Sequence, residues 1–292
     1  ASGIPQLIQS YSYSTTDNVY LSNDKIKVGF NLRYGGAISY LSQINSNVNL
    51  VNNASDGGRQ IQPDYYQKPT NYTQNGKVPI AAWATNGYNT TLGGDYNRNT
   101  VTLLEYHTVT DGYYIKFKPL LWGFDGEISE IVIEATYTLV GNSVKCVYNY
   151  INQRTDGMIV ENNFIGWSLP TVHLNQAFTK FYSYTGISPY TNDTVTPLDI
   201  QTNINGEANS KEFWGAMFNP TTGIGVGVYN KMANHTDTYF QFKKQVSNNI
   251  DSEFSDGFSV IQTLDTYSTP DSHTQWNRTD TAYLIVGNIT EI

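Results

Sequence analysis

Two side chains in the middle of the sequence have the types and spacing needed for proton transfer. Glu161 stands in the run IVENNF, where a carboxylate interrupts apolar residues, and His173 follows in SLPTVHL. Hydrolysis of a glycosidic bond needs an acid and a second group that acts as base or nucleophile. Histidine exchanges protons near neutral pH. We therefore predict that Glu161 supplies one carboxyl group and His173 a proton-transfer partner; a hydrogen-bonded structural role is the alternative for His173.

A second group of residues is suited to holding a hydroxyl-rich ligand. Arg59, Gln60 and Tyr66 lie in the stretch DGGRQIQPDYY. Guanidinium and amide groups present hydrogen-bond donors in a fixed geometry, and an aromatic ring can pack on the apolar side of a pyranose. We predict that these three residues contact the substrate. The alternative is an exposed loop in which Arg59 pairs with Asp56 or Asp64.

Two tryptophans and another histidine complete the predicted binding residues. Trp167 lies between the two catalytic candidates, and Trp214 belongs to an aromatic pair that follows Glu212. His107 shares a strand face with Glu105, because residues two apart in a strand point the same way. A nearby carboxylate orients an imidazole and raises its pKa. A solvent-facing pair on an antiparallel sheet is the alternative, and the pattern favours it for His107.

Other chemistries have weaker support in the sequence. For β-elimination, Tyr66 or His173 would act as base and Arg59 would neutralise a uronate, but the net charge of -8 counts against an anionic substrate. No HxH or HExxH motif and no cluster of aspartates occurs. We predict neither a metal site nor a cofactor; a structural Ca²⁺ among the Asp and Asn loops is the alternative.

The composition predicts an all-β protein. Aromatic residues make up 14% of the 292 residues, charged residues another 14%, and there are 23 tyrosines. Aromatic and β-branched residues favour strands, whereas glycine and asparagine favour turns. The chain is acidic and has no run of Lys or Arg, so we predict that it does not bind nucleic acid. The lone cysteine, Cys146, alternates with apolar strand residues and is expected to be a buried thiol.

The location of the protein is predicted from weaker signals. No apolar run approaches the roughly 20 residues needed to cross a bilayer, so we predict no membrane insertion. The start without Met and the recurring Asn-X-Ser/Thr sequons favour a secreted, extracellular glycoprotein.

The elements that must position these residues are predicted from period-two alternation. Ile131–Leu139 and Val144–Ile151 are the longest clean alternations, and Gly141-Asn142 between them predicts a central hairpin. Phe213–Phe218 and Ile224–Tyr229 predict another hairpin. Pro170 interrupts the strand that carries His173, which predicts an edge strand beside the site.

The stretch from Ile26 to Leu50 carries a resemblance to a known superfamily. An alternating strand ends at Gly35-Gly36, Ala37-Ile38 opens a second strand, and a short Asn-Leu element follows. This order resembles the galactose-mutarotase-like β-supersandwich, which includes aldose epimerases, carbohydrate-binding domains and domains of glycoside hydrolases and polysaccharide lyases. The resemblance implies one large antiparallel β-sandwich domain over residues 1–292. A jelly-roll-type sandwich would produce the same alternation and is the alternative.

The resemblance implies a carbohydrate ligand but not the epimerase reaction. Epimerases of this type are expected to use two histidines and a late glutamate. His107 and His173 would form the pair, but an HPYFNL-like motif is absent and neither Glu253 nor Glu291 has a recognisable context. We therefore predict a glycoside hydrolase acting on a neutral or weakly charged oligo- or polysaccharide. A non-catalytic glycan-binding or structural surface protein is the first alternative, and a polysaccharide lyase is the second.

Overall fold

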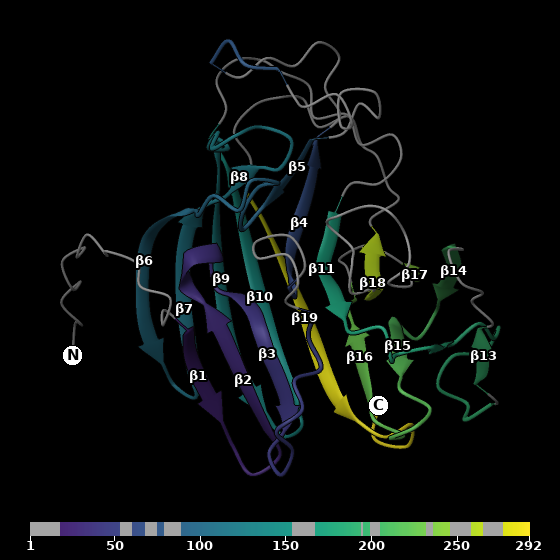
Figure 1. The fold of residues 1–292 in the computed structure, drawn as a ribbon. Coiled ribbons are helices and arrows are strands. Elements are labelled where there is room, and N and C mark those ends of the chain that lie inside the picture. Colours follow the sequence, from purple (N-terminus) through teal and green to yellow (C-terminus); the bar gives the residue numbers. More distant parts are fainter. Residues whose placement is uncertain are drawn as a thin grey trace.

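The protein folds into three antiparallel sheets. The computed structural model describes residues 18–52, 60–67, 75–78, 89–153, 167–193, 195–198, 205–231, 236–245, 258–264 and 277–292. Within these ranges the sheets contain three, nine and seven strands (Figure 1). The prediction of an all-β, large antiparallel fold is therefore confirmed.

The nine-stranded sheet forms one layer of the molecule. Its strands, from one edge to the other, are β13 (Thr196–Leu198), β12 (Lys180–Ser183), β15 (Trp214–Phe218), β16 (Gly225–Tyr229), β19 (Asn277–Gly287), β10 (Ser143–Asn152), β9 (Ile131–Val140), β7 (Gly112–Lys118) and β6 (Thr102–Val109). Every second residue of β10 is buried, as expected for a strand with one face on a core. The predicted hairpins β9–β10 and β15–β16 are both present, and β9–β10 lies inside the sheet.

The three-stranded sheet comprises β1 (Asn18–Ser22), β2 (Ile26–Asn31) and β3 (Ala37–Gln43). Between β2 and β3, a short 3-10 turn ends at Gly35 and Gly36, whose φ angles are 69° and 74°. A Cβ at Gly35 would lie 2.4 Å from the ring of Phe117. Glycine is therefore required both by backbone conformation and by the close approach of the nine-stranded sheet.

The seven-stranded sheet contains the strand with His173. Its order is β14 (Asn205–Ser210), β17 (Thr238–Gln245), β18 (Phe258–Leu264), β11 (Trp167–Leu174), β4 (Gln62–Gln67), β5 (Asn89–Leu92) and β8 (Leu120–Leu121). The prediction that Pro170 marks an edge strand is wrong, because β11 is paired on both sides. A register shift between Ser168 and Thr171 accommodates this proline, which has no N–H to donate.

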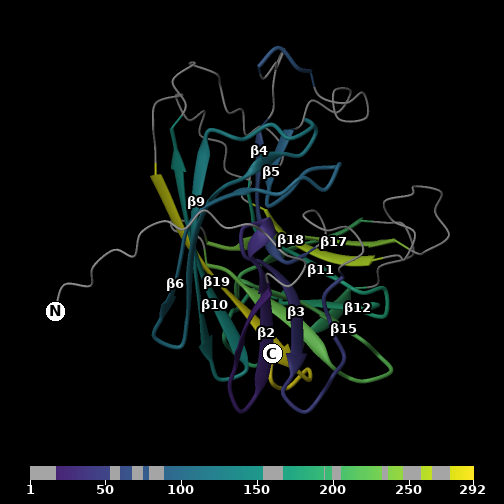
Figure 2. The same cartoon turned by 60° about the vertical axis from the view of Figure 1, so that its left-hand side comes forward.

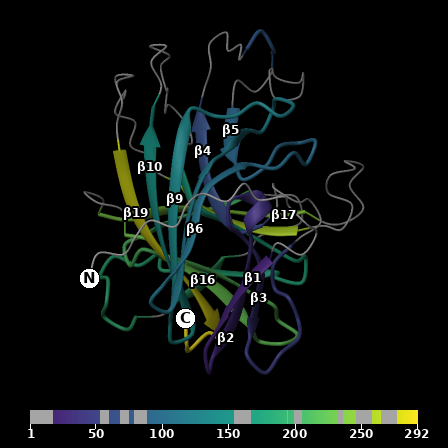
Figure 3. The same cartoon turned by 90° about the vertical axis from the view of Figure 1, so that its left-hand side faces the viewer.

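The two large sheets pack face to face, and the small sheet extends the layer of seven strands. The rings of Phe181 and Phe242 lie 5.4 Å apart across the interface, and a Cβ at Gly215 would lie 3.0 Å from Phe242. Backbone bridges join Ile38 of β3 to Ile61, just before β4, and Val51, in the segment after β3, to Leu174 of β11. Figures 2 and 3 show β2, β3 and β17 on one side of the long strands β9, β10 and β19.

Candidate functional site

A row of polar residues crosses five strands of the seven-stranded sheet. The residues are register partners from strand to strand and are called the amide row: Glu207 on β14, Gln241 on β17, Gln262 on β18, Thr171 on β11 and Gln62 on β4. Directly opposed residues on neighbouring strands have Cβ atoms about 4.5–5.5 Å apart. The side chain of Gln262 is not described; the register lines up the amides of Gln62 and Gln241 and the hydroxyl of Thr171 across the sheet.

The amide row lies on the face that points away from the nine-stranded sheet. Val172, Ile261 and Phe242 occupy the alternate positions of their strands, and all three belong to the core between the layers. Neighbouring residues of a strand point to opposite faces of the sheet. The same alternation that builds the core therefore directs the row outward.

Three residues of the row are buried although they lie on an outward face, whereas Glu207 at its end is exposed. Gln62 is 1% exposed, Thr171 0% and Gln241 6%. Gln62 Oε1 accepts a hydrogen bond from the Gly93 N–H at 3.0 Å, and Gln241 Nε2 donates to Glu207 Oε1 at 3.3 Å. Gln241 Oε1 accepts no hydrogen bond from any residue that the structure describes. Burying such an acceptor costs about 1–3 kcal/mol, so the row is not explained by stability alone.

His173 lies beside the amide row, two positions beyond Thr171 on β11. Its Nδ1 is 3.3 Å from the backbone oxygen of Gln60, and its own carbonyl accepts from the Asn52 N–H at 3.0 Å. A carbonyl oxygen can only accept, so this contact favours the tautomer that carries the proton on Nδ1. Nε2 is then the nitrogen with the lone pair, as a proton acceptor requires.

Charged and phenolic groups flank the row on β17. Lys243 pairs in register with Val260, which in turn pairs with His173. Burial lowers the pKa of Lys243, and the Glu207 carboxylate opposes this only in part. Burial also raises the pKa of Tyr239, and a hydrogen bond to Glu207 adds to that rise. A cation, a carboxylate and a protonated phenol therefore lie on strands β14 and β17.

The structure brings the two predicted segments together. β4, which follows Gln60, pairs directly with β11, so Trp167 is the register partner of Tyr65, next to Tyr66. The side chains of Trp167 and Tyr66 are not described. Arg59 and Glu161 lie outside the described residues altogether, and their predicted roles stay predictions.

His107 is in the other large sheet, apart from His173. Its Nδ1 lies 3.1 Å from Glu105 Oε1, and its ring stacks on that of Tyr114 with centroids 4.7 Å apart. The side chains of His107 and Glu105 are each 47% exposed. The shared strand face predicted for this pair is present, and the pair faces outward.

This pair adjoins a second cross-strand row, which is called the charged ladder. Its register partners are Glu105 on β6, Lys116 on β7, Glu134 on β9, Asn149 on β10 and Thr279 on β19. Glu134 contacts Lys116 Nζ at 2.9 Å and accepts from Asn149 Nδ2 at 2.8 Å, while Thr279 Oγ1 donates to Asn149 Oδ1 at 3.2 Å. Lys116, Glu134, Asn149 and Thr279 therefore satisfy one another, while Glu105 pairs with His107.

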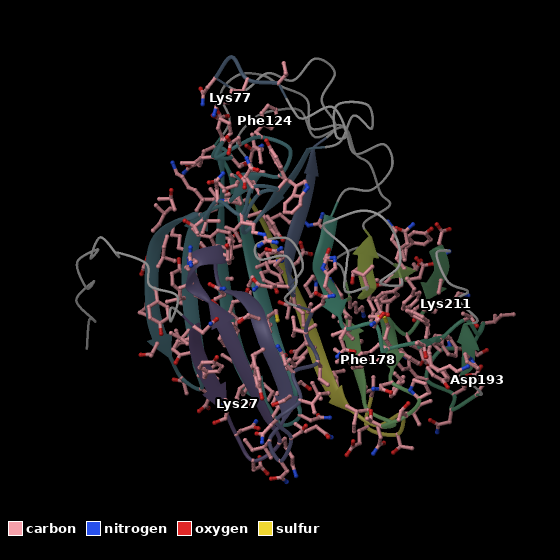
Figure 4. All side chains as sticks on the ribbon, in the orientation of Figure 1. Lys27, Lys77, Phe124, Phe178, Asp193 and Lys211 are labelled. Atoms are coloured by element: carbon pink, nitrogen blue, oxygen red, sulfur yellow. The ribbon has the colours of Figure 1, made fainter. Side chains whose placement is uncertain are left out.

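A third polar cluster closes the loops near β8 (Figure 4, around Lys77). Lys77 Nζ lies 2.7 Å from Glu127 Oε1, and Asn99 Nδ2 donates to both Asp95 and Asp125. The buried Asp95 also accepts from three backbone N–H groups. These acids have partners within their own loops, so the cluster is built to hold loops together.

Trp214, the remaining predicted binding residue, is on β15 of the nine-stranded sheet. Its Nε1 donates to Glu212 Oε2 at 2.9 Å. Trp214 and Tyr182 lie on the face of that sheet opposite to Met217, which belongs to the core. Trp214 is therefore not brought together with His173.

Sequence reasoning missed the β17 and β14 part of the amide row. The signal was present in the run YFQFKK, where Gln241 stands between two phenylalanines that alternate into the core. A polar residue in that position faces away from the core at period two. Which strands lie beside it depends on pairings between distant segments, and the sequence does not specify those.

Two kinds of feature are absent from the described ranges. These ranges contain no group of three or more His, Cys, Asp or Glu side chains arranged to hold a metal ion. No helix within them has both the length and the apolar character needed to cross a lipid bilayer.

Solved structures share this architecture. A candidate aldose 1-epimerase from Escherichia coli K12 matches 93% of this chain and 99% of its own, with a TM-score of 0.57 and 10% identity. A galactose mutarotase related enzyme from Lactobacillus acidophilus matches 93% and 97%, with a TM-score of 0.54 and 9% identity. The 4-alpha-glucanotransferase of Thermococcus litoralis matches 93% of this chain and 37% of its own, with a TM-score of 0.50 and 12% identity. No protein-family model and no curated protein matches the sequence. The chain thus has the galactose mutarotase-like fold, as the stretch from Ile26 to Leu50 suggested.

Proposed function

We propose that this protein is a carbohydrate-active protein that binds a saccharide across the amide row. The observation that carries the proposal is the buried row itself, in which Gln62, Thr171 and Gln241 are aligned by strand register with one acceptor left unsatisfied among the described residues. Amides both donate and accept hydrogen bonds. A sugar hydroxyl does the same, so each amide of the row can meet a hydroxyl in either role.

The names of structurally similar proteins support a sugar as ligand. Neighbours with this fold include a candidate aldose 1-epimerase, a galactose mutarotase related enzyme and a 4-alpha-glucanotransferase. Each name refers to a saccharide, but the reactions differ. Because one fold hosts several chemistries, the reaction must be argued from this chain's own residues.

For the reaction we retain hydrolysis of a glycosidic bond in a neutral or weakly charged, extracellular polysaccharide. His173, whose Nδ1 contacts the Gln60 carbonyl, would transfer the proton between water and the reacting centre through Nε2. Glu161 would supply the carboxyl group that protonates the leaving oxygen, and Arg59 and Tyr66 would position the sugar. Water adds across the broken bond, so no other reactant is consumed.

Saccharide binding without turnover is the second candidate function. Glycoside hydrolysis usually needs two carboxyl groups on either side of the scissile bond, about 5–9.5 Å apart. Among the described side chains, the amide row offers only Glu207, which is three strands away from Thr171. With strands about 4.8 Å apart, Glu207 is too far away to work with a group on β11.

The two functions separate in one experiment. The protein is incubated with soluble neutral polysaccharides, and released reducing ends and retention in glycan-containing gels are both measured. Hydrolysis predicts reducing ends that disappear in Glu161→Gln and persist in Lys116→Met, a control in the charged ladder. Retention without release selects the binding protein, and a rise in unsaturated-uronate absorbance on an acidic glycan selects a lyase. If no glycan retains the protein and no glycan releases reducing ends, the proposal is wrong.

A further inference from the structure

The outward face of the nine-stranded sheet has a row of aromatic residues of its own. Trp214 on β15, Tyr229 on β16 and Tyr283 on β19 are register partners across three adjacent strands, and we call them the aromatic platform. All three side chains are partly exposed. The rings of Tyr229 and Tyr283 have centroids 6.2 Å apart. Adjacent strands are about 4.8 Å apart, so the platform spans roughly 10 Å.

A small pocket adjoins the platform at Trp214. It has a volume of about 240 Å³ and is lined by Tyr182, Val195, Glu212, Trp214, Phe218, Ile289 and Ile292. Drug-sized ligands occupy pockets of about 300–1,000 Å³, so this one suits a single small ring. Glycines on β16 help to shape it, since a Cβ at Gly225 would lie 2.4 Å from the ring of Phe218 and one at Gly227 would lie 2.3 Å from Ile292.

The indole at the edge of the pocket is fixed in place. Glu212 accepts from Trp214 Nε1 at 2.9 Å through one oxygen and from the Tyr190 N–H at 2.7 Å through the other. Tyr190 adopts a left-handed φ of 61°, a conformation uncommon for a residue with a side chain. A ring already held in position loses little further freedom when a ligand stacks on it.

The chemistry of the pocket favours an uncharged ligand with both apolar and hydroxyl surfaces. Aromatic rings offer flat apolar contact, and the phenol hydroxyls are polar at the ring edge. The Glu212 carboxylate lines the pocket and disfavours anionic ligands, while each of its oxygens can accept more than one hydrogen bond. A pyranose presents apolar C–H faces and hydroxyl donors together.

The geometry points to a second saccharide site, in which one sugar ring enters the pocket beside Trp214 and the following residues of a neutral polysaccharide stack along Tyr229 and Tyr283. This site faces away from the amide row, because Gly215 and Met217 on the same β15 strand point into the core between the layers. It takes no part in bond cleavage. Ligand binding at this site can therefore be tested independently of the function proposed for the opposite face.

Affinity electrophoresis with soluble β-glucan, galactan and arabinoxylan tests this site. Trp214→Ala and Tyr229→Ala are each expected to weaken retention of the protein by at least one of these glycans about tenfold, the loss of one stacked ring. Tyr114→Ala removes an aromatic residue from the same face of the sheet, beside the charged ladder and away from the platform, and this variant should bind as wild type does. Trp214→Phe, which keeps a ring in place, should lose less than Trp214→Ala.

Fluorescence titration keeps the test informative if a variant folds poorly. The chain has five tryptophans, and the emission change on adding the retained glycan should be smaller in Trp214→Phe than in wild type. Unchanged affinity in both Trp214→Ala and Tyr229→Ala would overturn the inference. A protein that no glycan retains would also overturn it. If the variants lose self-association in sedimentation and no glycan binds, the platform is instead a contact between copies of the chain, and the inference is wrong.

Discussion

The amide row and the charged ladder are built in the same way but differ in how their polar groups are satisfied. Each crosses five strands through register partners. In the ladder, Lys116 and Asn149 bond to Glu134 between them, and Glu105 at the end is 47% exposed. In the row, Gln62, Thr171 and Gln241 are buried. Stabilising a sheet surface is sufficient to explain the ladder, whereas the row keeps polar groups in a costly place.

Among substitutions in the two rows, Gln62→Leu should cause the largest loss of stability and of glycan retention. It removes the acceptor of the buried Gly93 N–H, which costs about 1–3 kcal/mol of unfolding free energy, and it also removes an amide from the proposed saccharide site. Urea unfolding and glycan retention would both be measured. Thr279→Val, the matched loss of one hydrogen bond in the ladder, should cost well under 1 kcal/mol. Equal losses from the two substitutions would break the comparison.

Gln241→Leu should separate stability from binding. The substitution removes a buried oxygen that accepts no bond from the described residues, and it also removes the 3.3 Å bond from Nε2 to the exposed Glu207, so the free energy of unfolding should change by less than about 1 kcal/mol. Saccharide affinity should fall about tenfold, since one hydrogen-bonding group of the row is lost. Thermal unfolding and gel retention would decide. A stability loss above 1 kcal/mol together with unchanged affinity would show that Gln241 is a structural residue.

The ladder should account for part of the acid sensitivity of the protein. Burial acts to raise the pKa of Glu134, but hydrogen bonds from Asn149 and Lys116 outweigh it and hold the pKa below its ordinary value. Between the folded and the unfolded pKa of Glu134, the unfolded chain therefore binds more protons than the folded one. The ladder's contribution to the free energy of unfolding is complete above about pH 5 and is lost as the pH falls through the folded pKa. Urea unfolding at pH 7 and pH 3.5 should show a smaller difference in Asn149→Ala than in wild type. An unchanged difference would mean that Glu134 does not contribute.

Lys116→Met should have the smallest effect. Ion pairs near a surface contribute about 0.2–1 kcal/mol, and the loss should shrink in 1 M salt because that contribution is screened. Glycan retention should equal that of wild type. A decrease in retention would place saccharide binding on the ladder and remove the contrast between the two rows.

The sequence predicted those parts of the molecule that depend on neighbouring residues. Alternation located the β9–β10 hairpin, Gly35-Gly36 marked a turn that needs positive φ, and the spacing of Glu105 and His107 predicted their contact. Pro170 was misread because a proline at a bulge does not need the N–H that an edge strand would expose. The partners of Gln241 were not predicted, since they come from strands far away in the chain.

That distance has a consequence for how the protein reaches its native state. The ladder joins β6, β7, β9 and β10, which follow one another closely along the chain, and only β19 arrives from far away. The row needs β4 to meet β11 and β11 to meet β18, across long intervening stretches. Closing long loops is slow, because their entropy is lost before distant contacts compensate. We therefore expect the hairpins of the ladder to form early and the saccharide-binding face to be completed among the last steps of folding.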